Sequence, residues 1–168
     1  MHRQGHYGVA LVAYAPVVTV LVALNALALA GLGGLVVVGG AMLPDVDQRV
    51  PGVTHRGVTH TVWFALTVGI VVGAAGVAVG WERGPATSLA LGGFGLFVGT
   101  LAVVAHLLGD VLTPAGIRPF APVRKTKYTF GVVTAANPIA NYLLLGLGVV
   151  AVGVAIVAGR AVATGFGV

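Results

Sequence analysis

The chain has 168 residues, of which 58% are hydrophobic and only 8% are charged. A soluble domain carries about 25% charged residues, so most of this chain cannot face water. Its length gives room for about five membrane spans of about 20 residues each and leaves little for a soluble domain. Because the sequence has no cysteine, disulfides and thiolate ligands are excluded, and a bound metal would need His nitrogen and carboxylate oxygen.

The net charge of +5 does not by itself indicate a nucleic-acid partner. The basic residues lie in short loops between apolar runs, and this pattern in a membrane protein sets orientation and attracts anionic lipid. The electrostatic footprint is too small for nucleic acid, so we expect no such partner. A cleavable signal peptide is not expected either, because the first apolar run continues without an obvious small-residue cleavage site.

A long apolar run near the start predicts a helical hairpin. Residues 7–43 contain no charged side chain. At a rise of about 1.5 Å per residue, this run is too long for one span. We expect the hairpin to turn between Asn25 and Gly34.

The remaining apolar runs predict an all-α, polytopic transmembrane bundle of about five spans, with residues 1–168 as one integral membrane domain. After a polar loop at 44–57, spans are expected at about 58–80, 86–112 and 139–159, separated by a turn at 81–85 and a polar segment at 113–138. We expect Thr54 or Thr59 to cap the third span. The spacing of Gly95 and Gly99 predicts close packing between helices of the same chain.

The positive charges give this topology an orientation. With a hairpin first, seven basic residues lie on one side of the membrane, and only Arg83 and Arg160 lie on the other. The seven are Arg3, Arg49, Arg56, Arg118, Arg124, Lys125 and Lys127. This asymmetry is expected when the first side is cytoplasmic. We therefore expect a multi-pass protein of the inner or plasma membrane with a cytoplasmic N-terminus.

Three of the four acidic residues fall in two short motifs. Asp45 and Asp47 follow Pro44, and Asp110 lies four residues after His106 on an apolar helix. Residues four apart project from one helix face, and ionisable groups within a span usually face an interior site. The two neighbouring carboxylates repel unless a cation or a proton lies between them. A structural His–Asp hydrogen bond and a solvated helix end are the alternatives for these motifs.

The predicted topology brings these motifs to one face of the membrane, together with several histidines, and this convergence predicts a divalent-metal site. The expected ligands are His6, Asp45, His55, His60, His106 and Asp110. One or two ions, with zinc as the expected metal, suit His and carboxylate ligands without cysteine. Asp47 is a candidate general base or second-metal ligand, and Arg56 is a candidate clamp for an anionic group or an orientation charge. His2 and Glu82 lack such support.

The segment from Arg118 to Phe130 mixes cations with aromatic residues. This composition suits the lipid headgroup region, where the segment would serve either as a positive anchor or next to a substrate. It favours membrane lipid as the partner and a lipid phosphoester, or another anionic phosphoester, as the substrate.

The motifs, in this order, resemble the YdjM-type family of LexA-regulated inner-membrane proteins, described as membrane-bound metal-dependent hydrolases. The matching residues are His6, the motif 43–47, the run 55–61 from His55 through His60, and the run 106–117 followed by Arg118, Pro119 and Phe120. The resemblance extends to about Phe130 and departs at Gln48, where the family often has His. It implies a multi-span helical fold and metal-dependent hydrolysis.

Together, the residues and the resemblance predict a membrane-embedded metal-dependent hydrolase. It would act on a lipid or other phosphoester at the cytoplasmic face through a metal-activated water. One alternative is a non-catalytic membrane scaffold with a structural metal site. A divalent-cation transporter is disfavoured, because an ion path would need polar residues through the bilayer and these residues stop at one face.

Overall fold

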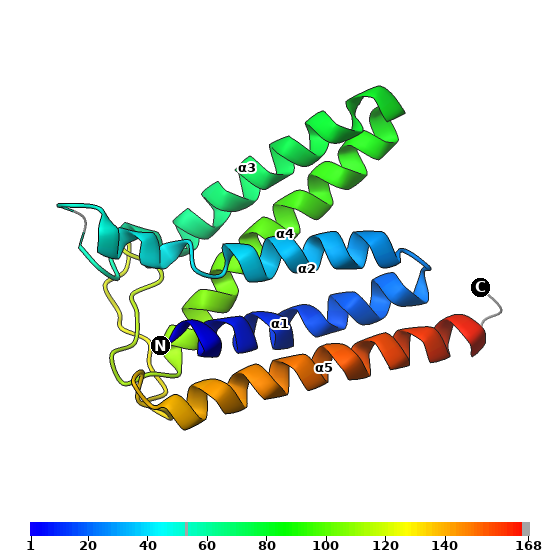
Figure 1. The fold of residues 1–168 in the computed structure, drawn as a ribbon. Helices are drawn as coiled ribbons and strands as arrows, with labels where there is room; N and C mark the ends of the chain where they lie inside the picture. The colour runs from blue at the N-terminus through cyan, green and yellow to red at the C-terminus, as the bar shows by residue number, and fades with distance from the viewer. Residues whose placement is uncertain (53, 166–168) are drawn as a thin grey trace.

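The computed structural model describes residues 1–52 and 54–165 and folds this part of the chain into five long helices (Figure 1). They are α1 (Arg3–Ala23), α2 (Leu27–Gly40), α3 (Val62–Gly80), α4 (Pro85–Val111) and α5 (Pro138–Gly165). Three 3-10 helices join them: η1 (Pro44–Arg49), η2 (Val58–His60) and η3 (Trp81–Arg83). With η1 and η3 counted as continuations of α2 and α3, all five are long and apolar enough to span a membrane. The predicted all-α bundle is confirmed, and the described ranges contain no strand, only an isolated bridge between Ile117 and Tyr128.

The hairpin turn between α1 and α2 lies at residues 24–26, at the start of the predicted range. Asn25 takes a left-handed conformation with φ of 57°. Asn tolerates this region better than most residues, because its short polar side chain bonds locally. The backbone N–H of Ala26 then donates to the carbonyl of Leu21 at 2.8 Å, which closes the end of α1.

The third span begins at Val62 and not at Val58, and the prediction that Thr54 or Thr59 caps it is wrong. Thr61 is the N-cap: its backbone is extended, and its Oγ1 accepts the N–H of Phe64 at 3.3 Å. Residues 58–60 form η2 instead, because the chain turns once more before the helix. This extra turn places His60 in the interior.

Two pairs of helices pack closely, α1 against α5 and α3 against α4 (Figure 1). Glycines allow these approaches, as expected where van der Waals contact between helices replaces the hydrophobic drive. A Cβ on Gly99 would meet Cα of Gly69 at 3.0 Å, and a Cβ on Gly148 would meet the carbonyl oxygen of Gly8 at 2.6 Å. The predicted packing role of Gly95 is also present, because its Cβ would lie 2.6 Å from the carbonyl oxygen of Val72.

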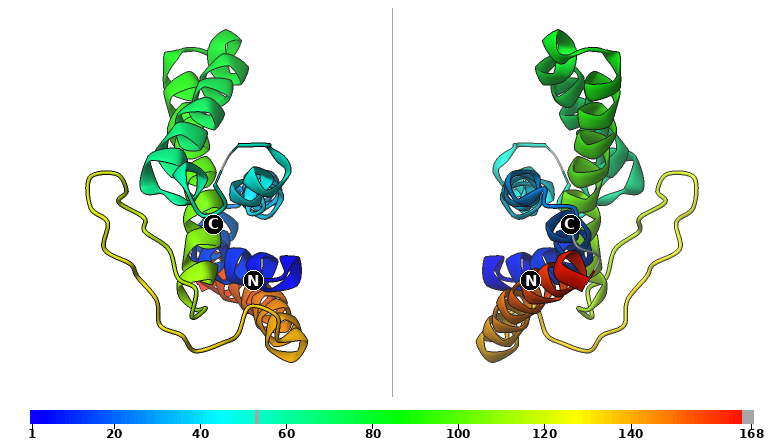
Figure 2. Two further views of the ribbon diagram at one scale, coloured as in Figure 1. Left: turned by 90° about the vertical axis from the view of Figure 1, so that its left-hand side faces the viewer. Right: turned by 90° about the vertical axis from the view of Figure 1, so that its right-hand side faces the viewer.

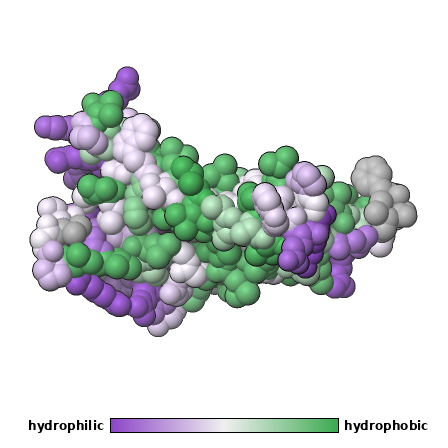
Figure 3. Space-filling model, turned by 90° about the horizontal axis from the view of Figure 1, so that it is seen from above, coloured by the Kyte–Doolittle hydropathy of each residue, from purple (hydrophilic) through white to green (hydrophobic). Residues whose placement is uncertain are grey.

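One end of the bundle collects the N-terminus, the segment 41–61 and the segment 112–137 (Figure 1). We call it the polar end. The opposite end holds the α1–α2 turn, the α3–α4 turn and the end of α5. Hydrophilic residues gather toward the two ends, and a mainly hydrophobic surface lies between them (Figure 3). This distribution matches a bundle that crosses a bilayer.

Candidate metal centre

The polar end brings together side chains from four separate elements. His6 lies in the first turn of α1, Asp45 and Asp47 lie on η1, His60 ends η2, and His106 and Asp110 lie near the end of α4. His6, His60 and His106 are completely buried, and Asp110 and Asp47 are nearly so. Ionisable groups buried in an apolar bundle are costly unless they pair with one another or with an ion.

Two ring nitrogens lie at similar distances from each other and from one oxygen of each of two carboxylates, and we call Asp45, His60, His106 and Asp110 the four-donor cluster. Nε2 of His60 lies 3.2 Å from Nε2 of His106. Oδ2 of Asp110 lies 3.4 Å and 3.5 Å from these two nitrogens, and Oδ1 of Asp45 lies 3.6 Å from each. A tetrahedron built with zinc–ligand bonds of 2.0–2.2 Å has edges of about 3.3–3.6 Å. The spacing of His60, His106 and Asp110 therefore fits three ligands of one ion, and Asp45 lies at a similar distance from both nitrogens.

Hydrogen bonds at the other ring nitrogens orient both histidines of this cluster. Nδ1 of His106 lies 2.7 Å from the carbonyl oxygen of Ala41, which can only accept, so Nδ1 carries the proton. Nδ1 of His60 lies 3.0 Å from Oγ1 of Thr59, whose hydroxyl already donates to Asp47. In the neutral rings, both Nε2 atoms then carry lone pairs that face each other. Such outer hydrogen bonds commonly fix the tautomer of a metal-binding histidine.

A buried oxygen of Asp110 lacks a donor. Among the described residues, Oδ2 of Asp110 has no hydrogen-bond partner, although its carboxylate is almost completely buried. An unsatisfied buried acceptor costs about 1–3 kcal/mol, and more when it is charged. This oxygen faces the two Nε2 lone pairs of His60 and His106. A cation between the three atoms would satisfy all of them.

In the absence of a cation, a proton is the alternative occupant. Burial lowers the pKa of the His60 imidazole, but the neighbouring carboxylates of Asp110 and Asp45 outweigh it, so the pKa lies above its usual value. A protonated His60 could donate from Nε2 to these acceptors. Metal and proton therefore compete for the same lone pair.

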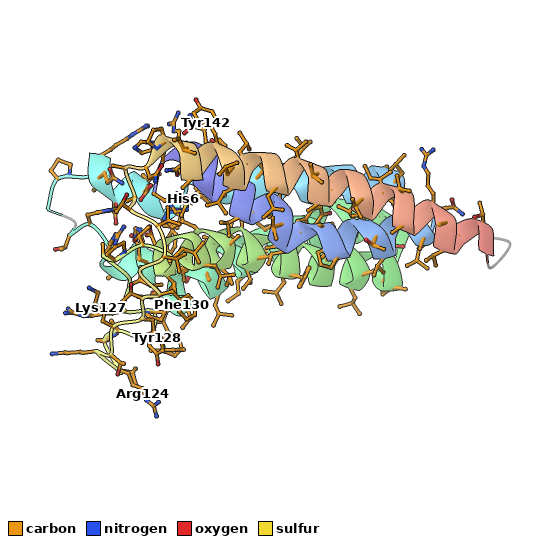
Figure 4. All side chains as sticks on the ribbon, turned by 90° about the horizontal axis from the view of Figure 1, so that it is seen from below. His6, Arg124, Lys127, Tyr128, Phe130 and Tyr142 are labelled. Carbon is orange, nitrogen blue, oxygen red and sulfur yellow. The ribbon has the colours of Figure 1, made fainter. Side chains whose placement is uncertain are left out.

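His6 is a second buried group without a partner. His6 lies at the polar end of the bundle (Figure 4). Its ring stacks on His106 at a centroid distance of 3.8 Å, and its Nε2 lies 3.8 Å from Oδ1 of Asp110. Neither ring nitrogen has a hydrogen-bond partner within the described ranges. His6, Asp45 and His106 each offer a ligand atom within 4.8 Å of the others. The predicted ligand His6 thus lies beside the four-donor cluster with both nitrogens available.

His55 and Asp47 form a pair at the edge of the site. Nδ1 of His55 lies 2.9 Å from Oδ1 of Asp47, and the His55 side chain is 43% exposed. Oδ2 of Asp47 accepts the hydroxyl of Thr59 at 2.7 Å and the backbone N–H of Arg56 at 3.2 Å. Asp47 is therefore placed to orient His55 and His60. His55 also belongs to a group with Asp45 and His60 whose ligand atoms lie within 4.8 Å of one another.

Arg56 is bonded to the protein itself. Its Nη2 donates to Oδ1 of Asp110 at 3.1 Å, and its Nη1 donates to the carbonyl oxygen of Gly116 at 2.9 Å. Its backbone has φ of 61°, a strained conformation for a residue with a long side chain, and such strain clusters at functional sites. These contacts place Arg56 as a support for Asp110. The anion-clamp role that the sequence predicts for it stays a prediction.

Sequence reasoning missed three groups at this site: the hydroxyl of Thr59 and the backbone carbonyls of Ala41 and Gly116. The sequence offered a signal for the Thr59 hydroxyl, because Thr59 directly precedes the predicted ligand His60. The carbonyls had none, because every residue carries one and only the tertiary structure selects which carbonyl faces a ring. The segment from Arg118 to Phe130 supplies no donor to the four-donor cluster, and Arg124 and Lys127 extend away from the bundle (Figure 4).

Comparison with known proteins supports the resemblance. The family model described as YdjM inner membrane protein matches residues 1–166. A search of curated proteins and a search of solved structures gave no match. The matched range includes every residue of the site described above.

Proposed function

The chain belongs to the YdjM inner membrane protein family, and we propose that it is a metal-dependent hydrolase that cleaves a phosphoester at the cytoplasmic face of the membrane. The observation that carries this proposal is the donorless Oδ2 of Asp110, which faces two imidazole lone pairs in a buried site. Seven basic residues at the polar end against two at the other favour a cytoplasmic polar end.

We propose zinc as the ion and the four-donor cluster as its ligands, with His6 and His55 available to a second ion. A bound divalent ion of this kind supplies an activated water and polarises a phosphoryl oxygen. The donor set of two imidazoles and two carboxylates, without thiolate, suits this chemistry. Asp45 is the most accessible member and lines a pocket of about 560 Å³ with Arg3 and Arg49.

The His55–Asp47 pair is the proposed route for protons. In hydrolysis, the oxygen of water bonds to phosphorus while the bond from phosphorus to the ester oxygen breaks. The water gives up a proton, and the departing alcohol takes one. His55 is half-exposed, and Asp47 holds its Nδ1 at 2.9 Å, so Nε2 is left to exchange protons. Asp47 does not exchange the proton itself but orients the His55 ring that does.

One observation favours the second candidate, a structural metal site without catalysis. The cluster offers four protein donors, and structural zinc sites are closed by four such ligands whereas catalytic sites keep a position for water. Hydrolysis therefore requires an open coordination position for water. Either Asp45 leaves the ion, or the donors are divided between two ions with His6 as a further ligand. Asp45 lies on the short helix η1, lines the pocket and is the most exposed of the four donors, so it is the ligand that we propose water replaces.

The deciding experiment is turnover by zinc-loaded protein in lipid nanodiscs, with a panel of phospholipids and soluble phosphoesters. The proposal expects release of phosphate or alcohol that disappears in the His106→Ala, Asp110→Ala double variant. The control is His2→Ala, which changes an exposed histidine outside the donor groups. Stoichiometric zinc without turnover of any substrate would favour the structural role.

A further inference from the structure

An apolar groove runs along α2. It has a volume of about 620 Å³ and lies between α1, α2 and α5. Leu11, Tyr14, Leu35 and Ile156 form part of its walls, and Gly31, Gly34 and Gly39 lie along it on α2. The hydroxyl of Tyr14 donates to the carbonyl of Ala30 at 2.9 Å, so the one polar side chain of the groove needs no partner from an occupant.

A polar pocket lies at the end of this groove. It is the 560 Å³ pocket that contains Asp45, and Arg3, Gln48 and Arg49 also line it. Within the described part of the chain, neither Arg3 nor Arg49 forms an ion pair with a carboxylate. Two cations next to a metal ligand form a site with the charge to bind a phosphate group.

The groove and the pocket meet at Gly39, which lines both. Leu27 and Gly39 mark the two ends of the groove on α2. Twelve helical steps cover about 18 Å. The apolar part thus follows α2 along almost its whole length, and the polar part begins at the end of α2 that lies at the polar end of the bundle.

We propose that an anionic glycerophospholipid binds here, with its phosphate between Arg3 and Arg49 and one acyl chain along α2. The proposal deepens the proposed function by naming a lipid as the substrate, and to that extent it rests on it. The lipid would approach from the α2 side. The segment 112–137 extends on the opposite side of the bundle and does not cover this approach (Figure 2).

The charge pattern selects this occupant over a second copy of the chain. A second copy would have to bring a carboxylate to Arg3 and Arg49, but the chain has only four acidic residues. Three of them lie in the metal centre, and Glu82 lies at the opposite end. An anionic lipid supplies a phosphate and an apolar chain in one molecule, at the depths where the pocket and the groove lie.

The glycines of the groove give a clean way to test the proposal. A Cβ at Gly31 or Gly39 would meet no other described residue within 4 Å, so a side chain there would fill the groove without displacing protein atoms. Gly153 on α5 is also exposed, and a Cβ there would likewise meet nothing within 4 Å, but it lies outside the groove lining. Gly31→Leu and Gly39→Leu can therefore be compared with Gly153→Leu as a matched control.

The experiment is photo-crosslinking in phosphatidylcholine nanodiscs, with phosphatidic acid that carries a diazirine in one acyl chain. We expect crosslinks on residues 31–39, competed by unlabelled phosphatidic acid and not by added phosphatidylcholine. Gly31→Leu and Gly39→Leu should each reduce this labelling about tenfold, and Gly153→Leu should leave it unchanged. Equal labelling in all variants, or crosslinks confined to α3 and α4, would overturn the proposal.

The proposed phosphate contacts of Arg3 and Arg49 are tested with a separate pair of variants and their control. Arg3→Gln with Arg49→Gln should remove the preference for phosphatidic acid over phosphatidylcholine, whereas Arg118→Gln with Arg124→Gln on the far segment should not. The opposite result would place the headgroup at that segment and overturn the assignment. Because labelling needs no turnover, crosslinks without hydrolysis would retain the lipid site and reject the hydrolase. Hydrolysis of a soluble phosphoester without crosslinks would support the hydrolase and reject the lipid site.

Discussion

Nε2 of His60 lies 3.2 Å from Nε2 of His106, and the hydrogen bonds at the opposite ring nitrogens leave both atoms with lone pairs. Two neutral imidazoles in this arrangement repel each other. A cation relieves the repulsion at once, and Asp110 adds a carboxylate oxygen at almost the same distance. The pair is therefore built for a positive charge, whether a metal ion or a proton.

Purified protein prepared without chelator is expected to carry a divalent ion, with zinc proposed. The His106→Ala, Asp110→Ala double variant should lose it, because half of the four-donor cluster is removed. Elemental analysis by mass spectrometry measures the metal content, and His2→Ala serves as the control with unchanged content. A metal-free wild type under these conditions would refute the site.

Thr59→Val should weaken metal binding while leaving the fold intact. The substitution keeps the shape of the side chain but removes the hydroxyl between Asp47 and His60. Loss of such an outer hydrogen bond costs about 10- to 100-fold in metal affinity. Competition with a fluorescent zinc chelator measures the change, and Thr67→Val on the exposed side of α3 is the control. An unchanged affinity for Thr59→Val would mean that His60 does not bind the ion.

Metal affinity should rise with pH through the neutral range. The pKa of His60 is raised in the metal-free protein, so its proton persists above the usual pKa of about 6.5 and must leave before a metal binds. For the metal-free fold the sign is opposite: this proton adds stability below the unfolded pKa, and that stability is lost as pH rises through the raised value. Thermal unfolding with and without zinc at several pH values measures both trends. If zinc affinity and the stability of the metal-free protein changed with pH in the same direction, His60 would not be the group that exchanges a proton for the metal.

Single cysteines can test the topology, because the sequence has none of its own. Cysteines at Arg49 and Lys125 should react with a membrane-impermeant reagent only from the cytoplasmic side, and a cysteine at Arg83 only from the other. Labelling in intact cells and in inverted vesicles distinguishes the sides. The same side for all three positions would overturn the five-span topology. Reversal of all three would instead place the polar end outside the cytoplasm.

Gly99→Leu should destabilise the bundle, because a Cβ there would meet Val72 and Cα of Gly69 at 2.9–3.0 Å. Overpacking of this kind costs about 1–3 kcal/mol. Gly93→Leu on the same helix is the matched control, since its Cβ would meet nothing within 4 Å in the described part of the chain. Unfolding in detergent should shift for the first variant only. Equal stability of the two would argue against close α3–α4 packing.

Much of the fold followed from simple quantities. The lengths of the apolar runs predicted five spans, and the alternation of loops predicted that His and Asp residues would meet at one end. The hairpin turn was predicted only as the range from Asn25 to Gly34. Asn25 is the only residue of that range that combines a polar side chain with tolerance for a left-handed backbone. In the structure it forms the turn.

The wrong cap prediction and the contacts that the sequence could not predict both lie where tertiary structure overrides local signals. Thr59 has the right chemistry for a helix cap, but its hydroxyl is used by Asp47, and Thr61 caps α3 instead. The contacts of Arg56 are a second case, although its predicted role toward an anion stays a prediction. Its left-handed backbone turns the guanidinium to Asp110, a residue 54 positions away, and no local pattern reveals such a contact.

The donors at the polar end come from α1, η1, η2 and α4, and α5 supplies none of the groups that could hold an ion. This distribution implies an order of events during biosynthesis. His6, Asp45 and His60 emerge early, but the pair of imidazole lone pairs exists only once His106 has entered the membrane with the fourth helix. Ion capture would therefore be a late step in membrane insertion.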